Sequence, residues 1–216
     1  MVEFFLRALL VAVIAYFCGC LNGAVIVSKY IFRDDVRNHG SGNAGLTNFM
    51  RVFGRKLASV VILADVIKAI VAICIGYLAI YKYNPPFEIT QFRTVAALWA
   101  AVFCMLGHMF PVMFQFKGGK GVLSGGIIAI MIDWRVALVV WGGFIVLVLV
   151  TRWVSLGSCW AGLTFPISIG LVFRDPSCII LGIICGGLLL FQHRGNIKRL
   201  ISGTEPKFSI HRNKEL

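Results

Sequence analysis

The chain has 216 residues, of which 59% are hydrophobic and only 14% are charged, and its mean hydropathy is +0.87. These values lie well outside the range of soluble globular domains, so we expect an integral membrane protein. Membrane topology together with attraction to anionic lipid explains much of the formal net charge of +12.

Apolar stretches follow one another along the chain at 4–29, 57–80, 94–114, 121–132, 135–150, 154–173 and 177–192. A helix needs about 20 residues to cross the ~30 Å hydrocarbon core of a bilayer. Single helices over 121–150 and 154–192 would be roughly 45 and 58 Å long, which is too long for one crossing. We therefore predict an all-α polytopic membrane bundle of about seven transmembrane helices, with a short fourth helix.

We predict one integral membrane domain over residues 1–216, because neither an internal repeat nor a dividing linker is found. The first apolar stretch has no basic region before it and no convincing small-residue cleavage site after it. It is therefore predicted to be a retained helix rather than a removed signal peptide.

The chain has seven cysteines, and all of them lie within apolar stretches. They form no CxxC pair and have no neighbouring histidine at metal-ligand spacing. We interpret them as small core residues, and neither a metal site nor a cofactor is predicted. They are Cys18, Cys20, Cys74, Cys104, Cys159, Cys178 and Cys185.

The basic residues lie mostly on one side of this predicted bundle. The segments 29–56, 115–121, 151–153 and 193–216 share one face and hold fifteen of the 21 lysine and arginine residues. By the positive-inside rule this face is cytoplasmic, which puts the N-terminus outside and the C-terminus inside.

Three polar segments lie on that face, and the first of them is "HGSGNAGLTNFMRVFGRK", residues 39–56. Its glycines permit backbone conformations that expose consecutive N–H groups, and Arg51 adds a planar charged fork. Such a segment suits an anion, although a polar turn before a helix N-cap would look similar. Its short polar side chains are Ser41, Asn43, Thr47 and Asn48.

The second polar segment is "GHMFPVMFQFKGGKGVLSGG", residues 107–126. Its glycines would let the backbone approach a ligand, a helix beginning near Val122 would direct free N–H groups at the same place, and Lys120 would add a charge. The Walker A pattern is excluded because Phe114 and Gly121 replace its required glycine and hydroxyl residue. A flexible basic loop at the lipid headgroups is the alternative interpretation.

The third polar segment is "HRGNIKRLISGTEPKF", residues 193–208. His193 and Asn196 are three residues apart, so on a helix they share a face and could address one ligand. Taken alone, the segment could also be a basic juxtamembrane helix that ends at Gly203 and Pro206. Together the three polar segments predict a cationic pocket at the membrane surface for a ligand with more than one anionic group.

Asp65 and Lys68 lie three residues apart inside the second apolar stretch. Charges within a membrane are costly, so these two side chains should pair or face the site, and we favour a structural pair.

The stretches "GSGNAGLTNFMR", "GHMFPVMFQFKGGKGV" and "HRGNIKRLISGTEP", in this order and spacing, resemble the bacterial acyl-phosphate-dependent glycerol-3-phosphate acyltransferases, the PlsY family. The resemblance covers nearly the whole chain. Departures at Ala44, Leu46, Leu123, Ser124 and Gly195 remove no charged or donor residue and bear on loop stiffness.

The resemblance implies a seven-span enzyme of the bacterial cytoplasmic (inner) membrane with its active site facing the cytoplasm. It would transfer a fatty acyl group from a long-chain acyl phosphate to the 1-hydroxyl of glycerol 3-phosphate, giving lysophosphatidate and phosphate. Membrane lipids and the soluble enzyme that makes acyl phosphate are the implied partners, and nucleic acid is not one.

The same resemblance implies a set of site residues. Catalytic roles fall on Ser41, Arg51, Lys120, His193 and Asn196. Substrate-binding roles fall on Gly42, Asn43, Thr47, Asn48, His108, Lys117, Gly118, Gly119, Gly121, Gly203 and Glu205.

The residues fit this chemistry without a covalent intermediate. The donor is already an activated mixed anhydride, so Ser41 is expected to donate a hydrogen bond rather than to attack. The H-x4-D base of other glycerolipid acyltransferases is missing, because Ala44, Met113 and Lys198 stand five residues after the candidate histidines. Either His193 or the substrate's own phosphate would accept the hydroxyl proton.

Three other functions fit the sequence less well. An anion transporter would place its basic residues near the midplane and repeat them in two halves. A lipid-binding scaffold would have no use for the His193 and Asn196 pair, and a CDP-alcohol phosphotransferase would need spaced aspartates that this chain lacks.

Overall fold

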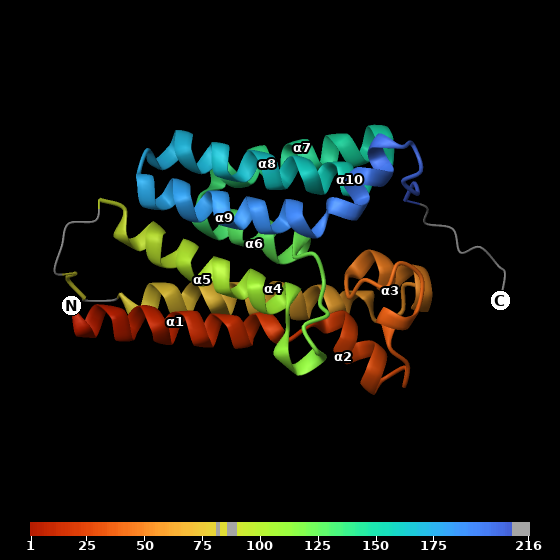
Figure 1. The fold of residues 1–216 in the computed structure, drawn as a ribbon, viewed down its shortest axis with the longest axis horizontal. Helices are drawn as coiled ribbons and strands as arrows, with labels where there is room; N and C mark the ends of the chain where they lie inside the picture. The colour runs from red at the N-terminus through yellow and green to blue at the C-terminus, as the bar shows by residue number, and fades with distance from the viewer. Residues whose placement is uncertain (81–82, 86–89, 209–216) are drawn as a thin grey trace.

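The computed structural model describes residues 1–80, 83–85 and 90–208, and every regular element within these ranges is a helix (Figure 1). The long helices are α1 (Val2–Cys20), α4 (Ala58–Ala79), α5 (Phe92–Met109), α7 (Trp134–Thr151), α8 (Val154–Phe173) and α9 (Pro176–Gln192). The shorter ones are α2 (Gly23–Tyr30), η1 (Val36–Asn38), α3 (Leu46–Phe53), η2 (Val112–Phe114), α6 (Val122–Ile132) and α10 (Arg194–Ile201).

The prediction of an all-α membrane bundle is confirmed, but the first predicted span is wrong in its extent. The apolar stretch 4–29 is broken after Cys20, and a new helix, α2, begins at Gly23. The buried Asn22 causes the break, because its side-chain oxygen accepts a hydrogen bond from the Val25 amide and so caps the N-terminus of α2.

Five segments of the described chain are long and apolar enough to cross a membrane, and α9 with α10 would make a sixth if the pair, bent by 61°, counts as one span. With 11 residues, α6 would be only about 16 Å long and cannot cross a ~30 Å core unaided. The protein is therefore a multi-pass membrane protein with five or six spans by length and composition, and the seven-span count stays a prediction.

The long helices form two groups that α6 joins. Helices α1, α4 and α5 pack together, and α8 packs against both α7 and α9. Helix α6 contacts both groups, and α5 also contacts α9. The short helices α2, α3 and α10 gather at one end of the bundle, opposite the start of α1 (Figure 1). All three polar segments lie at that end.

Small residues let the helices pack closely. A Cβ added to Gly107 of α5 would lie 2.0 Å from the carbonyl oxygen of Tyr16 in α1, and one added to Gly19 would lie 2.1 Å from that of Cys104. Van der Waals contact rather than the hydrophobic effect holds helices together in lipid, so close backbone approach matters here. The seven cysteines are free and buried or half-buried, as their interpretation as core residues predicts.

The Gly107→Ala variant should destabilise the bundle, because its methyl group would force α1 and α5 apart. Overpacking of this kind lowers the free energy of unfolding by about 1–3 kcal/mol, which thermal unfolding in detergent would measure. The matched control is Gly142→Ala in α7, where an added Cβ meets no heavy atom within 4 Å in the described part of the chain. Equal melting temperatures for the two variants would contradict the packing account.

Candidate active site

The three polar segments meet at Lys120. Its ammonium donates a short hydrogen bond to the side-chain oxygen of Asn196, which joins the second segment to the third. Arg51 of the first segment and Arg199 of the third lie near enough for their charges to act on Lys120. Cations from segments far apart in the sequence therefore surround one point at the end of the bundle.

The local backbone places Lys120 at the start of α6. Gly121 adopts a left-handed conformation, with φ of 78°, and directly precedes the first helical residue. The positive end of the α6 dipole therefore adds to the field around the ammonium. Burial lowers the pKa of Lys120, and the charges of Arg199 and Arg51 lower it further, whereas Glu205 opposes them.

The glycines of the second segment allow close packing in this structure, and their predicted approach to a ligand stays a prediction. The amides of Gly118 and Gly119 donate to the carbonyl oxygens of Met109 and His108, at 3.1 and 3.0 Å. A Cβ on Gly118 would lie 2.0 Å from the His108 carbonyl oxygen, and one on Gly119 would lie 2.7 Å from that of Ala44. These glycines let the loop lie flat against the end of α5, and the loop in turn holds Lys120.

His193 lies at the bend between α9 and α10 and is only 2% exposed. Its Nδ1 is 2.8 Å from the carbonyl oxygen of Leu189, so Nδ1 carries the proton and Nε2 is the basic nitrogen. Burial lowers the pKa of His193 to about 4, and the Lys120 charge contributes, although the bond to Leu189 opposes them. The imidazole is therefore neutral at physiological pH.

Glu205 lies behind Asn196 and orients it. One carboxylate oxygen accepts from the Asn196 amide nitrogen at 2.6 Å, and the other accepts from Arg199 at 2.7 Å. Because the amide nitrogen points to Glu205, the amide oxygen faces Lys120. Burial opposes ionisation of Glu205, but interactions with Ser155, Asn196 and Arg199 outweigh it and lower the pKa. Both carboxylate oxygens have protein partners, so Glu205 positions Asn196 and Arg199, and its predicted substrate-binding role stays a prediction.

The end of the third segment is tied to the turn between α7 and α8. The Trp153 indole donates to the Glu205 carbonyl oxygen at 3.1 Å, and the Phe208 amide donates to that of Arg152 at 2.7 Å. Gly203 provides the turn that brings the chain back, with φ of 70°. Gly203 therefore has a conformational role here, and its predicted substrate-binding role stays a prediction.

In the first segment, Asn48 shapes the loop. The buried amide donates to the carbonyl oxygens of Val36 and His39, at 3.0 and 3.1 Å, and accepts from the Ser41 amide at 2.9 Å. Asn48 therefore uses both ends of its side chain within the protein. Ser41, Gly42 and Arg51 are exposed, whereas Asn43 and Thr47 are half-buried.

Arg37, just before the first polar segment, connects that part of the chain to the second segment. The sequence alone did not identify it as a site residue. Its guanidinium donates to the carbonyl oxygens of Phe114 and Lys117, at 2.7 and 3.1 Å, and pairs with Asp35 at 2.7 Å. The hydrogen bond from Arg37 is the main reason that the pKa of Asp35 falls to about 2. Lys117 itself is exposed, next to the loop that Arg37 holds.

Asn22 is a second residue that the sequence analysis missed. Besides capping α2, its amide nitrogen donates to the Ala44 carbonyl oxygen at 2.9 Å and so anchors the glycine-rich part of the first segment. Its position inside an apolar stretch was the available signal.

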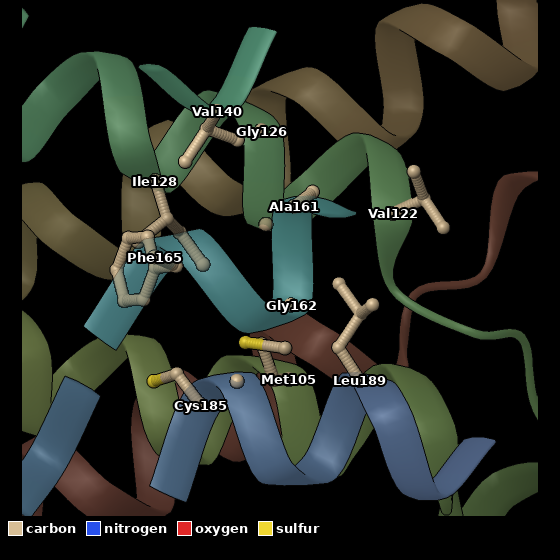
Figure 2. Close-up of a pocket in the computed structure, with 12 residues that line it drawn as sticks. Met105, Val122, Gly126, Ile128, Val140, Ala161, Gly162, Phe165, Cys185 and Leu189 are labelled. Atoms are coloured by element: carbon tan, nitrogen blue, oxygen red, sulfur yellow. The ribbon is translucent and has the colours of Figure 1, made fainter. Parts of the chain in front are cut away.

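A narrow apolar crevice begins beside the site, between α6, α8 and α9 (Figure 2). Its lining includes Val122, which follows Gly121, and Leu189, whose carbonyl oxygen bonds His193. Its volume of about 20 Å³ is enough for roughly one water molecule. Over residues 1–80, 83–85 and 90–208, no group of three or more His, Cys, Asp or Glu residues could hold a metal ion.

The chain matches a family described as "Glycerol-3-phosphate acyltransferase" over residues 9–203. A glycerol-3-phosphate acyltransferase of Thermoanaerobacter pseudethanolicus is 37% identical over 93% of this chain and 95% of the relative. A protein of the same name from Bacillus subtilis is 34% identical over 92% of this chain and 96% of the relative.

Two solved structures share the fold. The glycerol 3-phosphate form of PlsY, an integral membrane glycerol 3-phosphate acyltransferase, superposes with a TM-score of 0.80 at 29% identity, covering 94% of this chain and 96% of that one. Its lysophosphatidic acid form gives a TM-score of 0.77 at 28% identity over the same shares. The predicted resemblance is thus confirmed, and the chain belongs to the glycerol-3-phosphate acyltransferase (PlsY) family of integral membrane enzymes.

Proposed function

We propose that this protein transfers a fatty acyl group from a long-chain acyl phosphate to the 1-hydroxyl of glycerol 3-phosphate. The hydroxyl oxygen bonds to the acyl carbonyl carbon, the bond from that carbon to the phosphate oxygen breaks, and lysophosphatidate and inorganic phosphate leave. The observation that carries the proposal is the meeting of Lys120, Arg51, Arg199 and Asn196 beside the neutral His193.

The cationic groups would bring two anionic substrates together. Each substrate carries a phosphate, so they repel one another unless fixed positive charges offset the repulsion. Arg51 offers a planar fork suited to a phosphate, and Lys120 is a compact charge that also suits the developing oxyanion. Ser41 and Asn43, on the loop that leads into α3, and Thr47, in its first turn, would add hydrogen bonds to the glycerol phosphate.

His193 is one candidate for the general base, and the substrate's own phosphate is the other. Its Nδ1 proton is engaged by the Leu189 carbonyl oxygen, so Nε2 is the nitrogen that could accept the hydroxyl proton. The low pKa keeps this nitrogen unprotonated over the physiological range. The apolar crevice that begins at Val122 and Leu189 would receive the first methylenes of the acyl chain once it widens.

We place the site at the cytoplasmic face of the bacterial inner membrane, with the N-terminus outside and the C-terminus inside. The excess of lysine and arginine on the segments around the site supports this sidedness. A soluble enzyme supplying acyl phosphate could then reach the site directly. Labelling of a Gly203→Cys variant by a membrane-impermeant reagent from the outer face of intact cells would refute the sidedness.

The purified protein should convert acyl phosphate and glycerol 3-phosphate into lysophosphatidate with one phosphate released per product, without added metal. Acyl-CoA should be a poor substitute, because it lacks the phosphate that the cationic site would hold. Mass spectrometry of the lipid and a phosphate assay would measure both products. Lys120→Ala is the background control, and robust activity with acyl-CoA alone would contradict the proposed donor.

As the pH is raised, the KM for glycerol 3-phosphate should begin to increase before the pH reaches about 10.4, the ordinary pKa of lysine. The lowered pKa of Lys120 means that its ammonium loses the proton, and with it the attraction for phosphate, earlier than an exposed lysine would. A Lys120→Arg variant stays charged and should move this rise to higher pH.

A steady-state pH series would test this expectation. The control is Lys198→Arg, an exposed position on α10, which should leave the pH profile unchanged. An identical alkaline profile in wild type and Lys120→Arg would show that Lys120 is not the titrating group.

A further inference from the structure

A cluster of ionisable side chains lies inside the bundle, beneath the site. The Lys68 ammonium of α4 is 2.6 Å from a carboxylate oxygen of Asp65 and 2.6 Å from Nδ1 of His108 in α5. It also donates to the Leu21 carbonyl oxygen at 3.1 Å. The pairing of Asp65 with Lys68 is as predicted. The two opposite charges already neutralise each other, so the further bond from Lys68 to His108 needs another explanation.

This cluster is buried. The side chains of Lys68, His108 and Asp65 are 2, 3 and 4% exposed. A charge in such a place is costly unless it is paired, so the three side chains depend on one another. The Asp65 oxygen is paired with Lys68 by charge and distance without a well-aligned hydrogen bond. A change in one partner would therefore be felt by the others.

The bond direction fixes the state of His108. An ammonium can only donate, so Nδ1 of His108 accepts and the ring proton is on Nε2. That Nε2 lies against the glycine loop, because a Cβ added to Gly119 would be 2.3 Å from it. The Gly119 amide also donates to the His108 carbonyl oxygen. The imidazole thus forms the surface on which the residue before Lys120 rests.

The cluster reaches the other side of Lys120 as well. The hydroxyl of Ser124, in the first turn of α6, donates to the Asp65 carbonyl oxygen at 3.3 Å. Leu21, which Lys68 holds, directly precedes Asn22, which anchors Ala44 of the first polar segment. One buried unit therefore touches Gly119 before Lys120, Ser124 after it, and the loop opposite it.

We propose that Asp65, Lys68 and His108 form a positioning unit that sets the place of Lys120 relative to Asn196 and the first polar segment. The side chains of Lys68 and Asp65 do not touch substrate and act through His108, while the Asp65 main chain holds Ser124. His108, predicted to bind substrate, belongs to this unit. The consequence for catalysis rests on the proposed function, whereas the positioning of Lys120 does not.

The main test is the double variant Asp65→Asn/Lys68→Met, which removes both charges at nearly constant volume. Replacing a buried ion pair costs less than breaking one, but the Leu21 carbonyl oxygen and His108 Nδ1 lose their donor, so the melting temperature should fall while the protein stays folded. We expect kcat/KM to fall at least about tenfold, because small misplacements of catalytic groups are costly. An amine-acylating reagent would modify Lys120, and peptide mass spectrometry would follow the rate against pH. The pH at which this rate is half-maximal should differ between the variant and wild type.

His108→Asn provides a second variant should the double variant fail to fold. Asparagine keeps an acceptor for Lys68 but loses the ring surface under Gly119, so the same loss of kcat/KM and the same change in Lys120 titration are expected. The control is Ile73→Val, fully buried on α4 and outside the unit. It should lower the melting temperature without altering the titration midpoint.

A folded double variant or His108→Asn variant with wild-type kcat/KM and an unchanged Lys120 midpoint would overturn the proposal. The modification assay keeps the two proposals separate, since it needs no turnover. Wild-type protein without acyl-phosphate activity would refute the proposed function, while a changed midpoint in the variants would still support positioning.

Discussion

The burial of one ammonium group, that of Lys120, is the constraint on which the polar end of the protein depends. An ammonium in a partly apolar setting is stable only with aligned acceptors, and Asn196 provides one while Glu205 fixes the direction of that amide. The cations Arg51 and Arg199 push in the opposite sense and lower the pKa of Lys120. The site therefore holds more positive charge than the protein itself neutralises, which suits phosphate-bearing ligands.

Two kinds of glycine serve this arrangement. Gly19 and Gly107 let α1 and α5 approach closely in the membrane, while Gly118 and Gly119 let the loop before Lys120 lie on the end of α5. Both kinds work because a Cβ would collide with a backbone oxygen or a ring. Helix α5 thus packs against α1 in the bundle, and its last turn, which carries His108, supports the loop of the proposed active site.

The apolar pattern was sufficient to predict most of the helices, because every long apolar stretch except 4–29 contains one main helix. The three polar segments did gather at one end. The apolar pattern failed at Asn22, where one side chain caps a new helix inside an apolar stretch. Roles within the site could be assigned only from the structure. The sequence shows that Asn48 and Glu205 can form hydrogen bonds, but only their observed partners show that they hold neighbouring protein groups in place. Arg37 could not be foreseen, because its carbonyl partners are about 80 residues away.

A double-mutant cycle on kcat/KM with Lys120→Met and Asn196→Ala tests most directly whether the second and third polar segments act as one site. Residues in contact should couple by about 1–3 kcal/mol, so the double variant should lose little more than the worse single variant. A control cycle of Lys120→Met with Lys198→Met, exposed on the same helix as Asn196, should be additive. Additive losses for Lys120 and Asn196 would contradict the account.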